Sequence, residues 1–595
     1  MSGDIISLYR ARLARERGTV IKDPGGRLTI ALAYPNYYRL GMSNLGFQIV
    51  YGLLNKNPRV VAERAFLPEG QELSLYLRSG KPLLSLETQR PLHKFDLLAF
   101  SLSFENDYPN VLQTLDLARI PLLSKERSGP GPLVMAGGVT TFLNPEPLSP
   151  FMDFFLLGEA EGGMARFLEL FMEISPSTVS KRDALTDLAR NMPALYVPSL
   201  YRVQYHKDGT LKAFTPKGDG IPEKIGVAHP PEGGFAEKGV PISTVTTPDT
   251  EFGNKVLLEL GRGCGHSCRF CAAGYVYRPP RSYGNGELNI SLEKAVDKSR
   301  NIGLLSPAVS DIPGVENLMD AIVQRGGSFS VSSLRAETLT RGLLDRLRSS
   351  GQRSITVAPE AGSERLRRTI NKHLTESQIL EAVRMISGAG DFSLKLYFLM
   401  GLPTETDNDI RGIPELVKRI RHQMVRESAK RGTIGRIKLS VNCFVPKAFT
   451  PFQWFPMDEV GVLKKKQKWL KKSLTKTGGV HVGVDVPRWA YVQTLLSMGD
   501  RRTASILLAA HKRGGDWTRA MRFSDINPDF FVYRPKRVDE MLPWDFIDNG
   551  ISKEHLIRER DLALKGDESP ICSVGQCYRC GVCVREGAAS AARSS

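Results

Sequence analysis

The chain has 595 residues, enough for several domains that each bury a hydrophobic core. Its 41% hydrophobic and 24% charged residues are ordinary for a soluble globular protein, and it has no apolar run of the length (about 18 residues) that a transmembrane helix needs. The net charge of +18 fits a nucleic-acid partner, although diffuse positive charge is also common in proteins that bind no RNA.

The cysteines indicate the compartment in which the protein works. Seven of the eight lie in two tight clusters, a distribution that suits metal binding in a reducing cytoplasm. The N-terminal residues carry charges where a signal peptide needs an apolar core, so we expect a cytoplasmic protein. The eighth cysteine, Cys443, stands alone in an apolar run and is predicted to be a small buried side chain.

Residues 28–199, which follow a lead-in at 1–27, alternate between predicted strands and helices. The apolar runs that predict buried strands are 28–34, 96–103, 132–138 and 153–161. This alternation predicts an α/β fold with a doubly wound, Rossmann-type parallel sheet, which binds ligands at the carboxyl ends of its strands. Gly137 and Gly138 follow a strand and would let a ligand approach the backbone, although a tight turn explains them equally well.

A second α/β region follows a linker. Residues 200–250 are rich in proline, glycine and charge and are predicted to connect the two regions. Residues 251–455 contain six strand and helix units, which predict a partial (β/α)6 barrel whose ligand face lies where strands give way to loops. The runs that predict its strands are 255–263, 304–311, 328–335, 353–362, 393–403 and 436–447.

Cys264, Cys268 and Cys271 form a C-x3-C-x2-C motif in the loop after the first barrel strand. Three thiolates can hold three irons of a cubane iron–sulfur cluster and leave the fourth iron without a protein ligand. Zinc with His266 as a fourth ligand is the main alternative, but His266 lies inside the first cysteine gap, where joint ligation is awkward. A disulfide is disfavoured because nothing else indicates an oxidising compartment.

Residues 456–570 are basic and largely helical in pattern, with seven lysines and no acidic residue between 461 and 480. Leucines on one face predict an amphipathic helix that packs on the barrel and leaves a solvated lysine face. An RNA-binding face with Trp469 as a stacking residue is the alternative, and we favour the packed helix. The leucines are Leu463, Leu470 and Leu474.

The segment 571–595 carries four cysteines in a C-x4-C-x2-C-x2-C pattern, followed by a tail that we expect to be disordered. Four thiolates within 12 residues indicate a metal centre. Structural zinc is one candidate, because part of the motif is similar to a zinc-ribbon knuckle. Closely sequential ligation is nearer to that of ferredoxins, so an auxiliary [4Fe–4S] cluster is favoured. The cysteines are Cys572, Cys577, Cys580 and Cys583.

The first cysteine motif, with Phe270 before its last cysteine, resembles that of the radical S-adenosylmethionine (radical SAM) superfamily. The segments that resemble its Elp3-like branch, whose relatives include methylthiotransferases, are 306–311, 330–339, 358–372, 397–407 and 444–454. Residues 35–46 and 144–161 resemble the cobalamin-binding domain that many radical SAM proteins carry. Over nearly its full length the chain is similar to an uncharacterised family of cobalamin-domain radical SAM proteins.

The resemblance implies that the open iron binds the amino and carboxylate groups of S-adenosylmethionine (SAM), and that electron transfer then yields a 5′-deoxyadenosyl radical. It also implies that Phe270 borders the adenine and that Ser332, Arg335 and Glu360 line the SAM pocket. Arg335 could bind the SAM carboxylate and Glu360 its ribose or ammonium. An ordinary ion pair at the strand ends is the alternative for these two residues.

For the N-terminal domain the resemblance implies cobalamin, near Gly137, Gly138 and Asn144. The D-x-H-x-x-G motif that supplies a histidine ligand to cobalt is absent. Cobalamin would therefore bind without a protein ligand, unless the domain has lost the cofactor.

By this resemblance we predict a radical SAM enzyme, reduced by a partner such as flavodoxin or ferredoxin, that transfers a methyl group from cobalamin or carries out related C–H chemistry. One alternative is a tRNA- or rRNA-modifying enzyme of the methylthiotransferase kind. The N-terminal domain, however, lacks the three cysteines that methylthiotransferases use for a sulfur-donating cluster. The other alternative is a protein that has no enzymatic activity and senses redox state or a cofactor.

Overall fold

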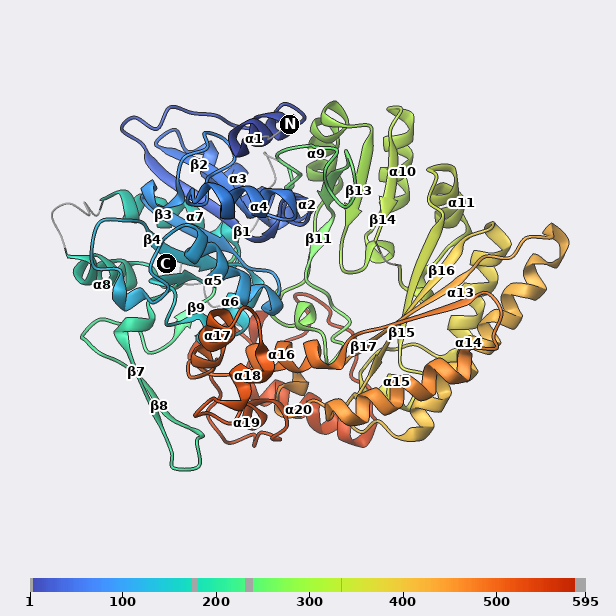
Figure 1. The fold of residues 1–595 in the computed structure, drawn as a ribbon. Coiled ribbons are helices and arrows are strands. Elements are labelled where there is room, and N and C mark those ends of the chain that lie inside the picture. The colour runs from blue at the N-terminus through green and yellow to red at the C-terminus, as the bar shows by residue number, and fades with distance from the viewer. Residues whose placement is uncertain (1–3, 174–179, 231–238, 333, 584–595) are drawn as a thin grey trace.

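The computed structural model describes residues 4–173, 180–230, 239–332 and 334–583. The chain forms an N-terminal α/β domain, a second α/β region with the shape of an open barrel, and a mainly helical C-terminal part (Figure 1). The C-terminal helices lie along the lower edge of the molecule and contact both α/β regions (Figure 1). The predicted fold class is therefore confirmed.

The N-terminal sheet has the strand order β2-β1-β3-β4-β5-β6, with β6 antiparallel to β5 and the other neighbours parallel. The order reverses at β1, so right-handed crossovers place the helices after β1 and β3 on opposite faces, as in a doubly wound sheet. The strands are β1 (Leu28–Tyr37), β2 (Val60–Leu67), β3 (Leu97–Ser101), β4 (Leu133–Gly137), β5 (Phe154–Leu156) and β6 (Leu195–Tyr196). The helices are α1 (Ile5–Leu13), α2 (Tyr38–Gly41), α3 (Leu45–Lys56), α4 (Gln71–Ser79), α5 (Tyr108–Leu117), α6 (Val139–Leu143), α7 (Ala160–Glu173) and α8 (Lys181–Asn191).

Strand β2 was not predicted, because Glu63 and Arg64 interrupt its apolar pattern. Both side chains are nevertheless buried. The Arg64 guanidinium pairs with Glu16 and Glu87, and hydroxyl groups of the loop after α4 donate to Glu63. Partners far apart in the sequence thus satisfy two charges in the middle of a buried strand, as buried charges require.

Residues 200–250 are more than the predicted linker. Strands β7 (Tyr201–Tyr205) and β8 (Leu211–Pro216) pair as an antiparallel hairpin that projects from the molecule (Figure 1). The short strand β9 (Ile225–Gly226) pairs with β19 (Ile547–Asp548) of the C-terminal part. Alternate residues of the hairpin face solvent, so its strands lack the continuous apolar runs of the buried sheet.

Six strands lie at or near the predicted runs, although β13 begins three residues before its predicted run, and a seventh strand joins them. They form two parallel sheets, β10-β13-β14 and β15-β16-β17-β18. The seventh, β18, lies in the region predicted to be helical. The strands are β10 (Val256–Glu259), β13 (Asn301–Leu305), β14 (Ser328–Val331), β15 (Ser354–Glu360), β16 (Ser393–Met400), β17 (Ile437–Cys443) and β18 (Val480–Val484), with a two-residue pair β11 (Gly261–Arg262) and β12 (Arg281–Ser282) beside the cysteine loop.

The barrel helices connect these strands along the outer side (Figure 1). They are α9 (Asn285–Lys298), α10 (Val315–Gln324), α11 (Arg341–Ser349), α12 (Glu364–Thr369), α13 (Glu376–Ala389) and α14 (Asp407–Ser428). Cys443, at the end of β17, is buried as predicted.

The C-terminal part begins with the predicted amphipathic helix. Leu463, Leu470 and Leu474 of α15 (Val460–Leu474) are buried, and α15 packs against α14. The remaining helices are α16 (Pro487–Met498), α17 (Thr503–Lys512), α18 (Trp517–Arg522), α19 (Asp529–Val532) and α20 (Lys553–Lys565). The predicted disordered tail after Cys583 lies outside the described residues.

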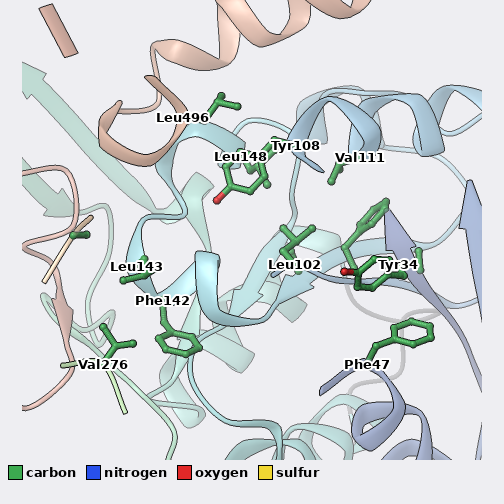
Figure 2. Packing of buried hydrophobic residues seen from close by; sticks show 14 of the residues in the cluster. Tyr34, Phe47, Leu102, Tyr108, Val111, Phe142, Leu143, Leu148, Val276 and Leu496 are labelled. Carbon is green, nitrogen blue, oxygen red and sulfur yellow. The ribbon is translucent and has the colours of Figure 1, made fainter. Parts of the chain in front are cut away.

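One hydrophobic core joins the three regions. In Figure 2, Leu496 of α16 lies above Leu148 and Tyr108 of the N-terminal domain, and Val276, from the segment after the cysteine loop, lies beside Phe142. This shared core fixes the cysteine loop against the N-terminal domain. Among the helices of the described ranges, none has the length and apolar character that a bilayer crossing requires.

Candidate active site

The three cysteines lie in the loop that follows β10, at the carboxyl end of the first barrel strand. Gly263 begins the loop with a φ of +80°, and a Cβ there would lie 2.4 Å from the carbonyl oxygen of Tyr277, so only glycine fits. Burial, together with the nearby thiols of Cys268 and Cys264, raises the pKa of Cys271 to about 12. The three thiols are therefore close neighbours.

The three thiols fit the cubane iron–sulfur cluster that the sequence indicates. Among the described residues no three His, Cys, Asp or Glu side chains are placed to hold a single metal ion. A cubane cluster binds each thiolate through a different iron, so its three ligands stand further apart than the ligands of one ion. His266 is engaged elsewhere, because its Nε2 lies 2.6 Å from Oδ2 of Asp311.

Charged side chains border the cysteine loop at the ends of β14 and β15. Nε of Arg335 donates to Oε1 of Glu337 at 2.7 Å, and Nζ of Lys372 lies 3.3 Å from Oε1 of Glu360. Burial raises the pKa of Glu360, and Lys372 opposes this shift. Arg335 and Lys372 both lie near the thiol of Cys268. Their positive charges would stabilise the thiolate form of this cysteine.

A cavity of about 450 Å³ lies between the N-terminal domain and the cysteine loop, and its lining is mostly apolar. This size is within the range of small-molecule sites. One wall comes from β1, β3 and β4 together with α3 and α7, and the other from residues that flank the cysteines. Gly263 and Ala273, on either side of the motif, are among the latter. The cavity therefore connects the two predicted cofactor regions.

Ion pairs close the cavity at the boundary between the domains. Arg262, two residues before Cys264, pairs with Glu159 and Glu161 of the N-terminal domain and with Glu259 at the end of β10. Glu159 also accepts from Arg281. A half-buried guanidinium with three carboxylate partners holds the cysteine loop in a fixed position relative to the N-terminal domain.

Two protein-family models match the chain. The one described as radical SAM proteins, N-terminal, matches residues 46–198, and the one described as radical SAM superfamily matches residues 258–417. Together they cover more than half of the chain, and the second includes Cys264, Cys268 and Cys271. The chain belongs to the radical SAM superfamily. A [4Fe–4S] cluster and SAM are the cofactors that this superfamily implies.

Among curated proteins, this radical SAM protein is 28% identical over 480 residues to the uncharacterized protein MJ0966 of Methanocaldococcus jannaschii, an alignment that covers 80% of the chain and 90% of the relative. Solved structures that are similar include the cobalamin-dependent SAM radical enzyme OxsB with aqua-cobalamin bound (16% identity, 66% of this chain and 52% of OxsB, TM-score 0.43). Another is the radical SAM methyltransferase TsrM from Kitasatospora setae (13% identity, 71% of this chain and 74% of TsrM, TM-score 0.44). The chain thus spans about half the length of OxsB.

The structure brings together most of the residues predicted for SAM and the cluster in this radical SAM protein. Arg335 and Glu360 lie near the cysteines, each in an ion pair. Ser332 lines the cavity. Phe270 is half-buried and packs against a small hydrophobic cluster that includes Phe444 of the barrel. Their roles in binding SAM remain predictions.

The residues predicted for a corrin are separated. Gly137 and Gly138 line the cavity, but a Cβ on Gly138 would lie 2.3 Å from the backbone oxygen of Leu102, so the close approach of the segment after β3 already requires this glycine. Asn144 does not line the cavity. Its amide donates to the carbonyl oxygens of Ser497 and Gly499, which ties the C-terminal part to the N-terminal domain. These hydrogen bonds give Asn144 a structural role, and its place near a corrin stays a prediction.

Sequence reasoning missed three charged residues of this site. Lys372 compensates Glu360, Arg262 joins the domains, and Arg278 is buried beside the cysteine loop. Arg262 and Arg278 lie within seven residues of the cysteine motif, and this proximity was the available signal. Two of the three carboxylate partners of Arg262 are more than 100 residues away, and Arg278 donates to a backbone carbonyl oxygen, neither of which the sequence reveals.

Proposed function

We propose that this radical SAM protein is an enzyme that reductively cleaves SAM. The observation that carries the proposal is the three-cysteine loop at the carboxyl end of β10, bordered by Arg335, Lys372 and Glu360 and open to an apolar cavity. When bound there, a [4Fe–4S] cluster with one open iron supplies the electron that splits the SAM sulfonium and yields a 5′-deoxyadenosyl radical.

The side chains of the chain bind, balance charge and exclude water. Arg335 presents a guanidinium that suits a carboxylate such as that of SAM. Lys372 opposes the rise in the pKa of Glu360 that burial causes and so favours the carboxylate form, which could accept from an ammonium or a ribose hydroxyl. The apolar cavity walls exclude water, which protects a reactive radical from side reactions.

We further propose that the cavity binds a corrinoid and that the reaction is a methyl transfer or a related C–H functionalisation. Three features support this. The cavity adjoins the ends of β3 and β4, its walls are mostly apolar, and it extends to the cysteine loop. Of the described residues that line it, none is a histidine, so a bound cobalt would have no imidazole ligand from the protein. A protein such as flavodoxin or ferredoxin is the proposed electron donor.

All eight cysteines are free thiols, which agrees with the reducing cytoplasm in which we propose the protein works. The cofactors of the proposed reaction are the cluster, SAM and the corrinoid. A second metal centre at the C-terminal cysteines would be additional to these.

Anaerobic reconstitution tests the proposal. The purified protein, reconstituted with iron and sulfide and reduced, is expected to release 5′-deoxyadenosine from SAM, and Cys268→Ala is expected to abolish the release. Hydroxocobalamin added to the protein should change its absorption spectrum if the corrinoid proposal is right. Release that is equal in the parent and in Cys268→Ala would contradict the enzymatic proposal.

One observation favours RNA as a second candidate substrate. Six lysines of and just after α15 are exposed and make no ion pair within the described residues, and Trp469 among them is 41% exposed. Retention on immobilised tRNA or rRNA that falls steeply with salt would support an RNA-modifying enzyme. The lysines are Lys464, Lys465, Lys468, Lys471, Lys472 and Lys476.

A further inference from the structure

We propose that the four C-terminal cysteines form a second metal site, a four-thiolate iron–sulfur centre, which lies directly against the first cysteine loop and shares Arg278 with it. The ligands are Cys572, Cys577, Cys580 and Cys583. This proposal does not rest on SAM cleavage, since it concerns which metal each cysteine set binds and where.

The four thiols gather in one short turn. Cys577, Cys580 and Cys583 all lie close enough to Cys572 to influence its thiol electrostatically. Gly575 and Gly581, with φ of +75° and +89°, permit the tight reversals that bring them together. The four thiols therefore lie near one another although the described part of the segment contains no regular strand.

The segment has little hydrophobic core of its own. Ile571, Val574 and Tyr578 are 47%, 51% and 59% exposed. Apolar side chains stabilise a segment only when they are buried, so these three contribute little. Small folds without a core usually depend on disulfides or a metal, and in this chain the cysteines are free thiols. A bound metal would explain why this segment forms a defined turn without a hydrophobic core.

The segment is in backbone contact with the first cysteine loop. The Cys572 N–H donates to the carbonyl oxygen of Gly265 at 2.9 Å, and Gly265 directly follows Cys264. A Cβ on Gly265 would lie 3.4 Å from the carbonyl oxygen of Cys572 and 3.8 Å from its Cβ. The two motifs, about 300 residues apart in the sequence, are therefore neighbours in space.

Arg278 lies between the two motifs and is 5% exposed. On one side, its Nε donates to the carbonyl oxygen of Gly274 at 2.7 Å and its Nη2 to Oγ of Ser267 at 2.6 Å. On the other side, its guanidinium interacts with the thiols of Cys580 and Cys572. A buried cation in this position would balance negative charge on both thiolate sets.

A second connection runs through Asn371, which is fully buried. Its Oδ1 accepts from the N–H of Ser569 at 2.9 Å, and its Nδ2 donates to the carbonyl oxygens of His266 and Ser267 at 3.3 Å. The segment that leads to the C-terminal cysteines is thereby fixed to the backbone between Cys264 and Cys268. A change of metal occupancy at one site should therefore alter the geometry of the other site.

The spacing favours an iron–sulfur centre over zinc. Closely sequential cysteines, with gaps of four, two and two residues, are typical of ferredoxin-like ligation. Structural zinc sites usually separate two ligand pairs by a longer loop.

Metal analysis of the full chain tests the proposal. The parent and two variants are reconstituted anaerobically with iron, sulfide and zinc all supplied, and bound iron, sulfide and zinc are measured. One variant replaces Cys264, Cys268 and Cys271 by alanine, and the other replaces the four C-terminal cysteines. Each variant is expected to keep roughly half of the iron and sulfide of the parent. Cys443→Ala, the matched control, should keep all of it.

Two results would overturn the assignment. If the four-cysteine variant kept the iron of the parent, the C-terminal cysteines would hold no iron–sulfur centre. If it lost zinc and no iron, the site would be a zinc site. Iron that remains in the three-cysteine variant supports the second centre even if no variant cleaves SAM, so the two proposals can fail independently.

The variant Arg278→Ala tests the shared arginine, and it also serves if the four-cysteine variant does not fold. We expect it to shift the reduction potentials of both centres, measured by electron paramagnetic resonance (EPR) during redox titration. Arg384→Ala, which removes an exposed arginine on α13, should shift neither potential. If Arg278→Ala also left both potentials unchanged, Arg278 would not be shared between the sites.

Discussion

Glu360 and Lys372 are 15% and 13% exposed and form an ion pair beside the cysteine loop. When one member of such a buried pair is removed, the other charge is left without compensation, which costs about 3 kcal/mol. This cost makes Lys372 a structural requirement of the proposed SAM pocket as well as a charge near the proposed cluster.

We therefore expect Lys372→Met to lower the midpoint of urea unfolding and to weaken SAM binding. Both can be measured on the reconstituted protein, by fluorescence-monitored unfolding and by equilibrium dialysis with labelled SAM. Arg384→Met breaks an exposed pair with Glu381 and should cost less than about 1 kcal/mol. A Lys372→Met variant as stable as this control would contradict the account.

Gly263→Ala is expected to disturb the cysteine loop directly. The new Cβ would meet the Tyr277 carbonyl oxygen at 2.4 Å in a backbone conformation with φ of +80°, so the loop must move. We predict a severalfold loss of bound iron, measured by colorimetric assay after reconstitution. Gly286→Ala, in α9 with no atom within 4 Å of the new Cβ, should retain iron and be slightly stabilised.

At the scale of elements, the boundary between the N-terminal domain and the barrel depends on charge. Burial would raise the pKa of Glu159, but a hydrogen bond with His229 and the charges of Arg262 and Arg281 outweigh it and lower the pKa to about 2. Because the folded pKa is below the ordinary value of 4.5, Glu159 stabilises the folded state above pH 4.5. This contribution, about 3 kcal/mol, is lost as the pH falls from 4.5 toward 2.

The Glu159→Gln variant tests this pH dependence. Its urea midpoint should be lower than that of the parent at pH 7, and the difference should shrink as the pH is lowered below 4.5. Glu381→Gln, on an exposed face of α13, should follow the parent at each pH. If the urea midpoints of the parent and Glu159→Gln differed by the same amount at pH 7 and pH 3, ionised Glu159 would not be the source of the stability.

The sequence predicted the elements whose burial follows a simple pattern. The barrel strands and β1, β3 and β4 read as apolar runs, and α15 showed its leucine face. Strand β2 was missed because Glu63 and Arg64 are buried with distant partners. Strand β18 was missed because its residues alternate between half-buried and exposed, as in an edge strand.

At the scale of the whole molecule, the cavity exists only because the two α/β regions meet. Its walls combine α3 and α7 with residues on either side of the cysteine motif. The sequence predicted a ligand site in each region, since both should bind ligands at the carboxyl ends of their strands. The sequence did not predict that these two sites share one cavity, or that the C-terminal cysteines contact the first cysteine loop. Both features depend on tertiary packing between distant segments, which no local sequence pattern encodes.

Filling the cavity should distinguish the proposed corrinoid site from the proposed SAM site. Ala160, at the start of α7, lines the cavity, and Ala160→Trp would occupy much of it. We expect at least a tenfold loss of affinity for hydroxocobalamin, measured by absorption titration, while SAM is still cleaved. Ala14→Trp, at an exposed position, should bind hydroxocobalamin as the parent does. Unchanged binding in Ala160→Trp would place the corrinoid outside this cavity.

The central claim is that the three cysteines leave one iron free to bind SAM. EPR spectroscopy of the reduced variant without C-terminal cysteines, recorded with and without SAM, tests it most directly because only the first cluster contributes. We predict that SAM changes the signal of this cluster, and that the change disappears when Cys268 is also replaced by alanine. A cluster signal that is identical with and without SAM would mean that no iron of this cluster binds SAM.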